Sequence, residues 1–160
     1  MGGKQAFGGY DTCMKPVAYL LLASVVSVAA TTGSDVVARM EVAGETFGYA
    51  TRDHLSIALN SWVGTIFLLA PFLIVGWTAA AIEKRARTRI AILVFAVGMV
   101  PLTYFYFHGY QAAQHALADE KWTAAALSIG LLPFFVGIPV LLLVGVTAAI
   151  AVGLDSRMSD

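Results

Sequence analysis

The chain has 160 residues, of which 59% are apolar and only 12% are charged, and its mean hydropathy is +0.78. Soluble domains carry about 25% charged residues, so this composition excludes an ordinary water-soluble fold. The ten basic and ten acidic residues cancel, which leaves no net field that would attract a nucleic acid.

Four long stretches of the chain contain no Asp, Glu, Lys, Arg or His: 16–34, 55–82, 90–107 and 122–154. A helix needs about 20 apolar residues to cross a bilayer, whereas a strand of a membrane barrel has only about ten alternating residues. The sequence therefore predicts an all-α integral membrane protein with a single domain, 1–160. Its four transmembrane helices are expected to form a bundle, and we place them near 16–33, 56–82, 90–114 and 123–154.

The first predicted helix carries small polar residues on one face, because Ser24, Ser27 and Thr31 follow one another at i, i+3 and i+7. Helices in lipid associate through close approach of small residues rather than by burying leucine. We therefore predict that this stripe contacts another helix, of the same chain or of a partner.

The loop between the first two helices, 33–55, is the only sizeable segment outside the predicted spans. Within it Met40 and Val42 alternate with polar neighbours just before Gly44. A period of two next to a glycine-containing turn is typical of a hairpin, so we predict a short outer β-hairpin between helices 1 and 2. Two strands alone are marginal in water, and the hairpin should rest on the bundle or on another protein.

Basic residues are distributed unevenly over the connections. The segment 83–89 holds four of them, and three more precede the first helix or follow the last: Lys4, Lys15 and Arg157. The opposite side holds Arg39, Arg52 and Lys121. Since short cytoplasmic connections collect Lys and Arg, we predict that both termini are cytoplasmic, most simply in a bacterial inner membrane.

The fourth predicted helix is unusually long, about 46 Å against a hydrocarbon core of about 30 Å, so it must tilt, bend or protrude. Pro133 and Pro139 can bend it, whereas internal prolines at Pro71 and Pro101 are ordinary in membrane helices. Glycines recur along this helix at intervals of seven or eight residues. We predict that they form a packing surface for another helix or a partner subunit: Gly130, Gly137, Gly145 and Gly153.

All three histidines are expected on the non-cytoplasmic side. On a continued third helix, His108 and His115 share a face with Gln111. With His54 and a carboxylate from the same side, they supply donors that suit zinc or copper. The predicted metal ligands are therefore His54, His108 and His115, although histidine is also well tolerated at membrane interfaces and no HExxH motif occurs.

Aromatic residues surround His108. An aromatic belt at headgroup depth is the simplest explanation. The sharper alternative is a pocket for a quinone, haem or pigment, with His108, Tyr104 and Tyr110 as the cofactor-binding residues. The sequence does not identify a cofactor.

Several function classes lack the residues that they require. No ionisable group lies within the four predicted cores, which argues against proton- or ion-coupled transport. The single Cys13 excludes chemistry that needs cysteine pairs, and no nucleotide-binding loop or nucleophile elbow occurs, so we predict no enzymatic activity.

The remaining features predict a non-catalytic membrane subunit that packs into and stabilises a larger complex, with other membrane protein subunits and membrane lipids as its partners. The main alternative is a small membrane protein that binds a metal, haem or quinone at its non-cytoplasmic face through histidines and aromatics. A passive channel lined by Ser, Thr and Gly is a third alternative.

Overall fold

The computed structural model describes residues 16–84 and 88–157, and within these ranges every regular element is a helix. The chain runs through α1 (Pro16–Val28), the π-helical segment η1 (Ala29–Gly33), α2 (Ser34–Ala38), η2 (Arg39–Ala43), α3 (Phe47–Asn60), α4 (Trp62–Glu83), α5 (Thr88–Ala118), α6 (Trp122–Gly130), η3 (Pro133–Gly137) and α7 (Ile138–Arg157). Four of the resulting rods are long and apolar enough to cross a membrane: Pro16–Ala43, Trp62–Glu83, Arg89–Ala118 and Trp122–Asp155. The expectation of an all-helical chain with four candidate spans is confirmed.

The first helix does not stop at residue 33 but continues to Ala43 through η1, α2 and η2. The predicted outer β-hairpin is therefore wrong, because its first half is helical and no strand occurs in the described chain. Alternation over only a few residues does not separate a strand from a helix, and an i,i+4 ion pair between Asp35 and Arg39 stabilises the helix here. Gly44, with φ of +67°, ends it.

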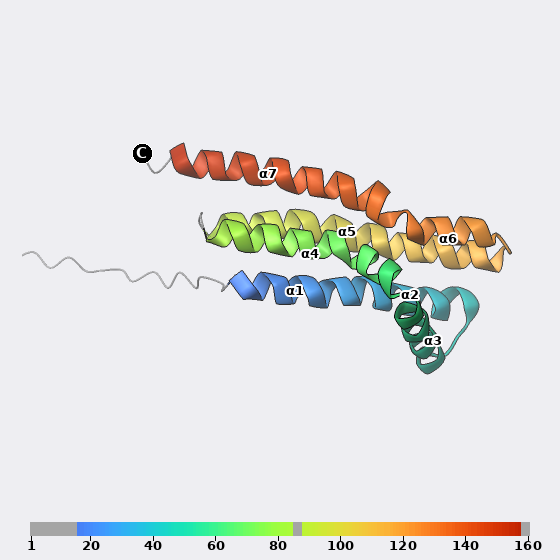
Figure 1. Cartoon of the computed structure of the whole chain (residues 1–160). Coiled ribbons are helices and arrows are strands. Elements are labelled where there is room, and N and C mark those ends of the chain that lie inside the picture. Colours follow the sequence, from blue (N-terminus) through green and yellow to red (C-terminus); the bar gives the residue numbers. More distant parts are fainter. Residues whose placement is uncertain (1–15, 85–87, 158–160) are drawn as a thin grey trace, which may run out of the picture.

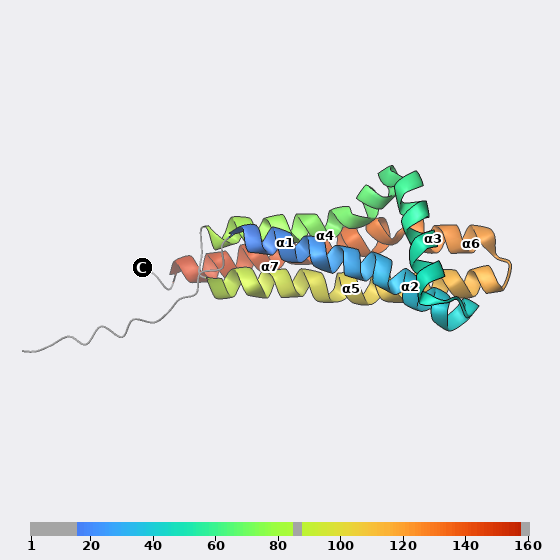
Figure 2. The same cartoon turned by 90° about the horizontal axis from the view of Figure 1, so that it is seen from below.

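The second predicted helix is two helices. Ser61 leaves helical geometry at φ −112° and ψ 43°, and it separates α3 from α4. In Figure 1 and Figure 2, α3 runs crosswise to the four long rods at one end of the molecule. The fourth rod is interrupted as well, since a turn at Leu131 and the π segment beginning at Pro133 separate α6 from α7.

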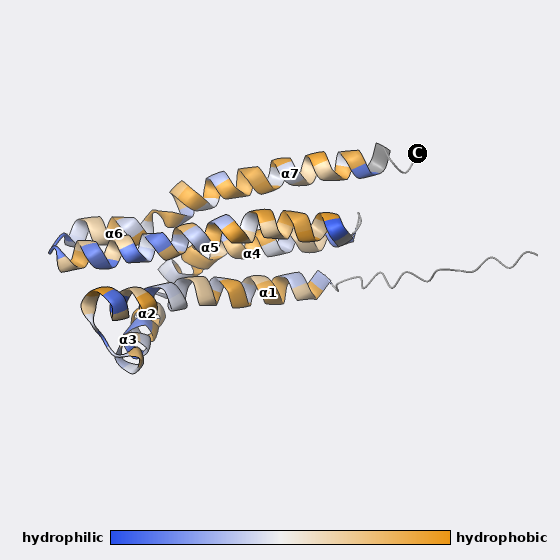
Figure 3. Ribbon diagram, turned by 180° about the vertical axis from the view of Figure 1, so that it is seen from behind, coloured by the Kyte–Doolittle hydropathy of each residue, from blue (hydrophilic) through white to orange (hydrophobic). Residues whose placement is uncertain are grey.

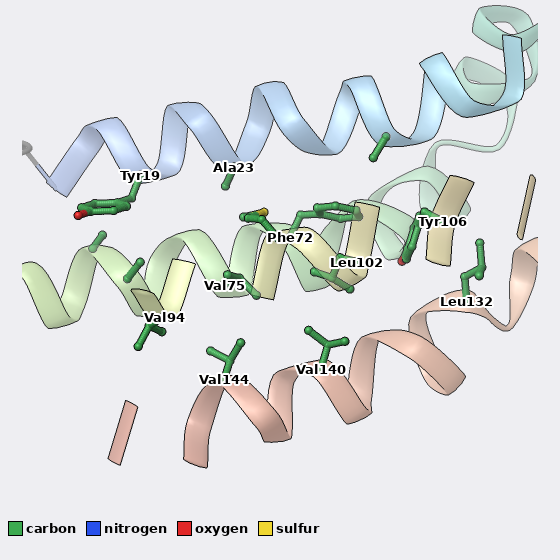
Figure 4. Close-up of a cluster of buried hydrophobic side chains, with 14 of the residues drawn as sticks. Tyr19, Ala23, Phe72, Val75, Val94, Leu102, Tyr106, Leu132, Val140 and Val144 are labelled. Atoms are coloured by element: carbon green, nitrogen blue, oxygen red, sulfur yellow. The ribbon is translucent and has the colours of Figure 1, made fainter. Parts of the chain in front are cut away.

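Helices α4 and α5 form the centre of the bundle, with α1 and α7 packed on opposite sides of them (Figure 1). Close approach depends on small residues: a Cβ added to Gly76 would lie 2.5 Å from the Ala23 Cβ. Figure 4 shows the buried side chains that fill the remaining space between the rods, among them Phe72, Val75 and Val144. This part of the structure is therefore a close-packed apolar bundle.

The two ends of the bundle differ. The start of α1, the end of α4 and the end of α7 lie together, and we call this the α4 end (Figure 1). The opposite end, which holds Gly44, the α5–α6 connection and the crosswise helix, is called the α3 end. Apolar residues dominate the rods between them, and hydrophilic residues gather toward both ends (Figure 3).

Candidate functional site

A buried carboxylate, Asp35, lies in the first rod near the α3 end and is only 4% exposed. Its Oδ2 accepts hydrogen bonds from Arg39 Nε at 2.9 Å and from His54 Nδ1 at 2.9 Å. Its Oδ1 accepts a hydrogen bond from Gln114 Nε2 at 3.1 Å. These contacts join α2 to η2, α3 and α5, and we call these four residues the Asp35 cluster. A buried charge must be paired and hydrogen-bonded in this way to be tolerated.

Arg39 faces more than one acidic group. Besides Asp35, its guanidinium donates from NH1 to Asp53 Oδ2 at 2.6 Å and lies 3.6 Å from Glu45 Oε2. Three carboxylates therefore surround one guanidinium. The site therefore holds a surplus of negative charge, which disfavours the approach of another anion.

His54 bridges the Asp35 cluster to the first rod. Because a carboxylate only accepts, the His54 Nδ1 facing Asp35 carries the hydrogen. In the neutral ring, Nε2 is then an acceptor, and the Thr32 hydroxyl donates to it at 3.1 Å. Thr32 belongs to η1, so the π turn presents this hydroxyl toward α3.

A cavity of about 900 Å³ lies beside the cluster, where the first turns of α4 diverge from the bundle axis (Figure 2). Its polar rim includes Thr32, Arg39 and the buried Asp35. Its walls are mainly apolar and come from α1, α3, α4 and α6, with α5 closing one side; they include Val28, Leu55, Ile57, Phe67, Leu68, Trp122 and Ile129. The cavity thus joins a fixed polar end to a long apolar interior.

Tyr110 of α5 lines the same cavity and is 4% exposed. Its hydroxyl has no hydrogen-bond partner among residues 16–84 and 88–157. One turn earlier, the Tyr106 hydroxyl donates to the Leu68 carbonyl at 2.9 Å. Because Tyr110 lines the cavity and its hydroxyl makes no hydrogen bond within the described chain, the hydroxyl marks a position for a ligand or water oxygen.

The three predicted metal ligands lie apart. His54 is in the Asp35 cluster, whereas His108 and His115 are exposed on α5. Within the described residues no group of three or more His, Cys, Asp or Glu side chains is placed to hold a metal ion. The structure does not bring these histidines together.

The predicted cofactor-binding residues are also divided. Tyr104 and His108 lie on the surface, with ring centroids 4.4 Å apart, and Tyr104 is 57% exposed. Tyr110 instead faces the cavity. Of these three residues only Tyr110 has a place in a site.

The predicted packing residues have mixed environments. Ser27 and Thr31 are buried and donate to their own helix, as does the exposed Ser24. A Cβ at Gly137 would lie 2.7 Å from the Pro71 ring. A Cβ on each of the other three would meet nothing within 4 Å in the described chain: Gly130, Gly145 and Gly153.

Sequence reasoning missed Asp35, Arg39 and Gln114. Asp35 and Arg39 belong to the same continuous helical rod as the first apolar stretch. The first rod therefore carries a buried charge. The absence of charge from the predicted spans, which argued against ion-coupled transport, does not hold for this rod. The sequence does contain a signal that the helix continues here, because an Asp and an Arg four residues apart directly follow an apolar run.

No protein-family model, curated protein or solved structure matches the chain. A functional assignment therefore depends on the geometry of the cavity and the Asp35 cluster.

Proposed function

We propose that the protein is a non-catalytic membrane protein that binds a small amphipathic molecule in the cavity beside the Asp35 cluster. One observation carries the proposal: a mainly apolar cavity of about 900 Å³ ends at the buried Asp35 carboxylate, which accepts three hydrogen bonds. Small-molecule sites typically occupy about 300–1,000 Å³ and combine apolar walls with a few convergent polar groups. A ligand that enters from the bilayer would place its apolar part along α4 and α6.

The polar rim is rigid, which supports a binding role. Asp35 accepts three hydrogen bonds from three different segments, and His54 is held at both ring nitrogens. Polar groups inside a membrane protein are costly, and they are retained where they orient helices or ligands. Fixed neighbours reduce the entropy that a ligand loses in being oriented at the rim.

A cavity-filling substitution tests the proposal. Gly64 lines the cavity, and a Cβ there would meet nothing within 4 Å, so Gly64→Phe adds a large side chain at the cavity wall without a clash at its Cβ. The matched control is Gly145→Phe, at an equally open position on α7 outside the cavity. We expect native mass spectrometry after mild detergent extraction to show a bound small molecule on the parent and on the control but not on Gly64→Phe. Equal retention by both variants would contradict the proposal.

A second role, as a packing subunit of a larger membrane complex, is favoured by the fourth rod. The remaining chain covers 17% of its most apolar stretch, against 39%, 39% and 33% for the other three rods. In Figure 1, α7 packs along one side only, and the open Gly145 and Gly153 lie on it. Other membrane subunits or lipids would cover this surface in a bacterial inner membrane with cytoplasmic termini. Recovery solely as a monomer after gentle extraction would count against this role.

A further inference from the structure

We infer that the ligand of this cavity has an uncharged head bearing a carbonyl oxygen, which accepts a hydrogen bond from the Tyr110 hydroxyl. Lipid-soluble quinones and neutral acyl glycerides both have this chemistry. The inference rests on the proposed binding function and specifies which ligands the cavity selects.

The first argument is the hydrogen-bonding capacity of the rim. The donors of Arg39 Nε, His54 Nδ1 and Gln114 Nε2 are all directed at Asp35, and the Thr32 hydroxyl is directed at His54. The Tyr110 hydroxyl makes no hydrogen bond within the described residues, and the side chain, which is only 4% exposed, lines the cavity. A phenolic hydroxyl that lacks a partner is best satisfied by an acceptor oxygen on the occupant of the cavity.

The second argument is charge, and it excludes an anionic head. The cationic side chains that line the cavity are Arg39 and, when protonated, His54. Arg39 already faces Asp35, Asp53 and Glu45, and His54 is bound to Asp35. A phosphate or fatty-acid carboxylate would enter a region with surplus negative charge and find no unengaged cation.

A cationic head is disfavoured for a different reason. Asp35 is the carboxylate that lines the cavity, and both of its oxygens already accept hydrogen bonds. A lipophilic cation would have to displace Arg39 or His54 to reach it. Displacing one partner of a buried pair leaves an uncompensated charge, which costs more than a neutral head that leaves the cluster intact.

Tryptophan fluorescence provides the test. Trp122 lines the cavity, whereas Trp62 and Trp77 do not, so a Trp62→Phe/Trp77→Phe background leaves one reporter at the site. The probe is decylubiquinone, which quenches nearby indole. Dioleoylglycerol, oleate and tetraphenylphosphonium are added as competitors, one neutral, one anionic and one cationic.

We expect saturable quenching by decylubiquinone, loss of it in Gly64→Phe, and affinity weaker by about five-fold in Tyr110→Phe. Tyr104→Phe, on the outer surface of the same helix, should change nothing. Displacement by dioleoylglycerol would assign the site to acyl glycerides as well as quinones, whereas oleate and tetraphenylphosphonium should not displace the probe.

The outcomes separate the two proposals. If Tyr110→Phe binds the probe as tightly as the parent while Gly64→Phe does not bind, the Tyr110 contact is overturned and the cavity function stands. Displacement by oleate or tetraphenylphosphonium as effective as by the neutral lipid overturns the charge argument. If the parent binds none of the probes, the inference fails. The native mass spectra of the parent, Gly64→Phe and Gly145→Phe then test the proposed cavity function independently of these probes.

Discussion

The two halves of the bundle are held together by different forces. The half toward the α4 end, which we call the apolar half, has one buried hydrogen bond between α1 and α4, from the Tyr19 hydroxyl to Glu83 Oε2, but its helices approach mainly through small residues, as where Gly76 meets Ala23, and apolar side chains fill the space (Figure 4). In the half toward the α3 end, which we call the polar half, hydrogen bonds to Asp35 join α2 to α3 and α5, and the helices surround a cavity. Close packing leaves no room for a ligand, whereas a directional polar cluster can hold helices together around an open space.

The largest loss of stability should come from removing Asp35, the common acceptor in the polar half. Asp35→Ala leaves Arg39, His54 and Gln114 without their common acceptor in a buried setting. We expect the free energy of unfolding to fall by about 3 kcal/mol, the lower end for breaking a buried ion pair, because Arg39 keeps Asp53 and Glu45. Denaturant unfolding in detergent, followed by circular dichroism, measures this change.

Asp119→Ala is the matched control for that substitution. Asp119 pairs with Lys121 across side chains that are 61% and 65% exposed, so its loss should change stability by less than about 0.5 kcal/mol. Equal effects of the two substitutions would show that the Asp35 cluster does not stabilise the polar half.

The apolar half is tested by adding one methyl group. In Gly76→Ala the new Cβ would lie 2.5 Å from the Ala23 Cβ and 3.1 Å from the Tyr19 carbonyl oxygen, so α1 and α4 must separate. We expect destabilisation of about 2 kcal/mol in the same unfolding measurement. Gly145→Ala, with open space around it, should be neutral, and a similar loss there would contradict the packing explanation.

Two tyrosines one turn apart sharpen the comparison further. Tyr106→Phe removes a hydrogen bond to the Leu68 carbonyl and should cost about 1 kcal/mol. Tyr110→Phe removes a hydroxyl that has no partner within the described chain, so stability without ligand should change by less than about 0.5 kcal/mol. Thermal unfolding of the two variants side by side distinguishes a structural hydroxyl from a ligand-binding one.

The apolar half could be predicted from the sequence because its signal is local. Each of the four charge-free runs overlaps one candidate span, although Ser61 divides the run 55–82 and a turn at Leu131 interrupts the run 122–154. The ends of the rods were harder to predict, because the charge-free run ends at residue 34 while the backbone stays helical to Ala43. Helical hydrogen bonds and the Asp35–Arg39 pair extend the helix beyond the apolar run.

The site could not be predicted because its contacts are distant in the chain. Gln114 lies 79 residues from Asp35, and His54 lies 19 residues from it, beyond the segment that was expected to form a β-hairpin. The sequence analysis grouped His54 with His108 and His115 as metal ligands, whereas in the structure only His54 pairs with a carboxylate on another helix. Burial distinguishes His54 from the exposed His108 and His115, and burial depends on tertiary packing.

The smallest effect is expected where the histidines are exposed. Replacing His108 and His115 together by Ala removes ring contacts of His108 with Tyr104 and Phe107 and no side-chain hydrogen bond within the described chain, so stability should change by less than about 0.5 kcal/mol. Retention of the bound molecule by native mass spectrometry should also be unchanged. His54→Ala, by contrast, should reduce it, because the imidazole orients the Asp35 carboxylate and the Thr32 hydroxyl at the cavity rim. If the double variant lost the ligand and His54→Ala kept it, the binding site would lie on the outer face of α5, and the cavity assignment would have to be abandoned.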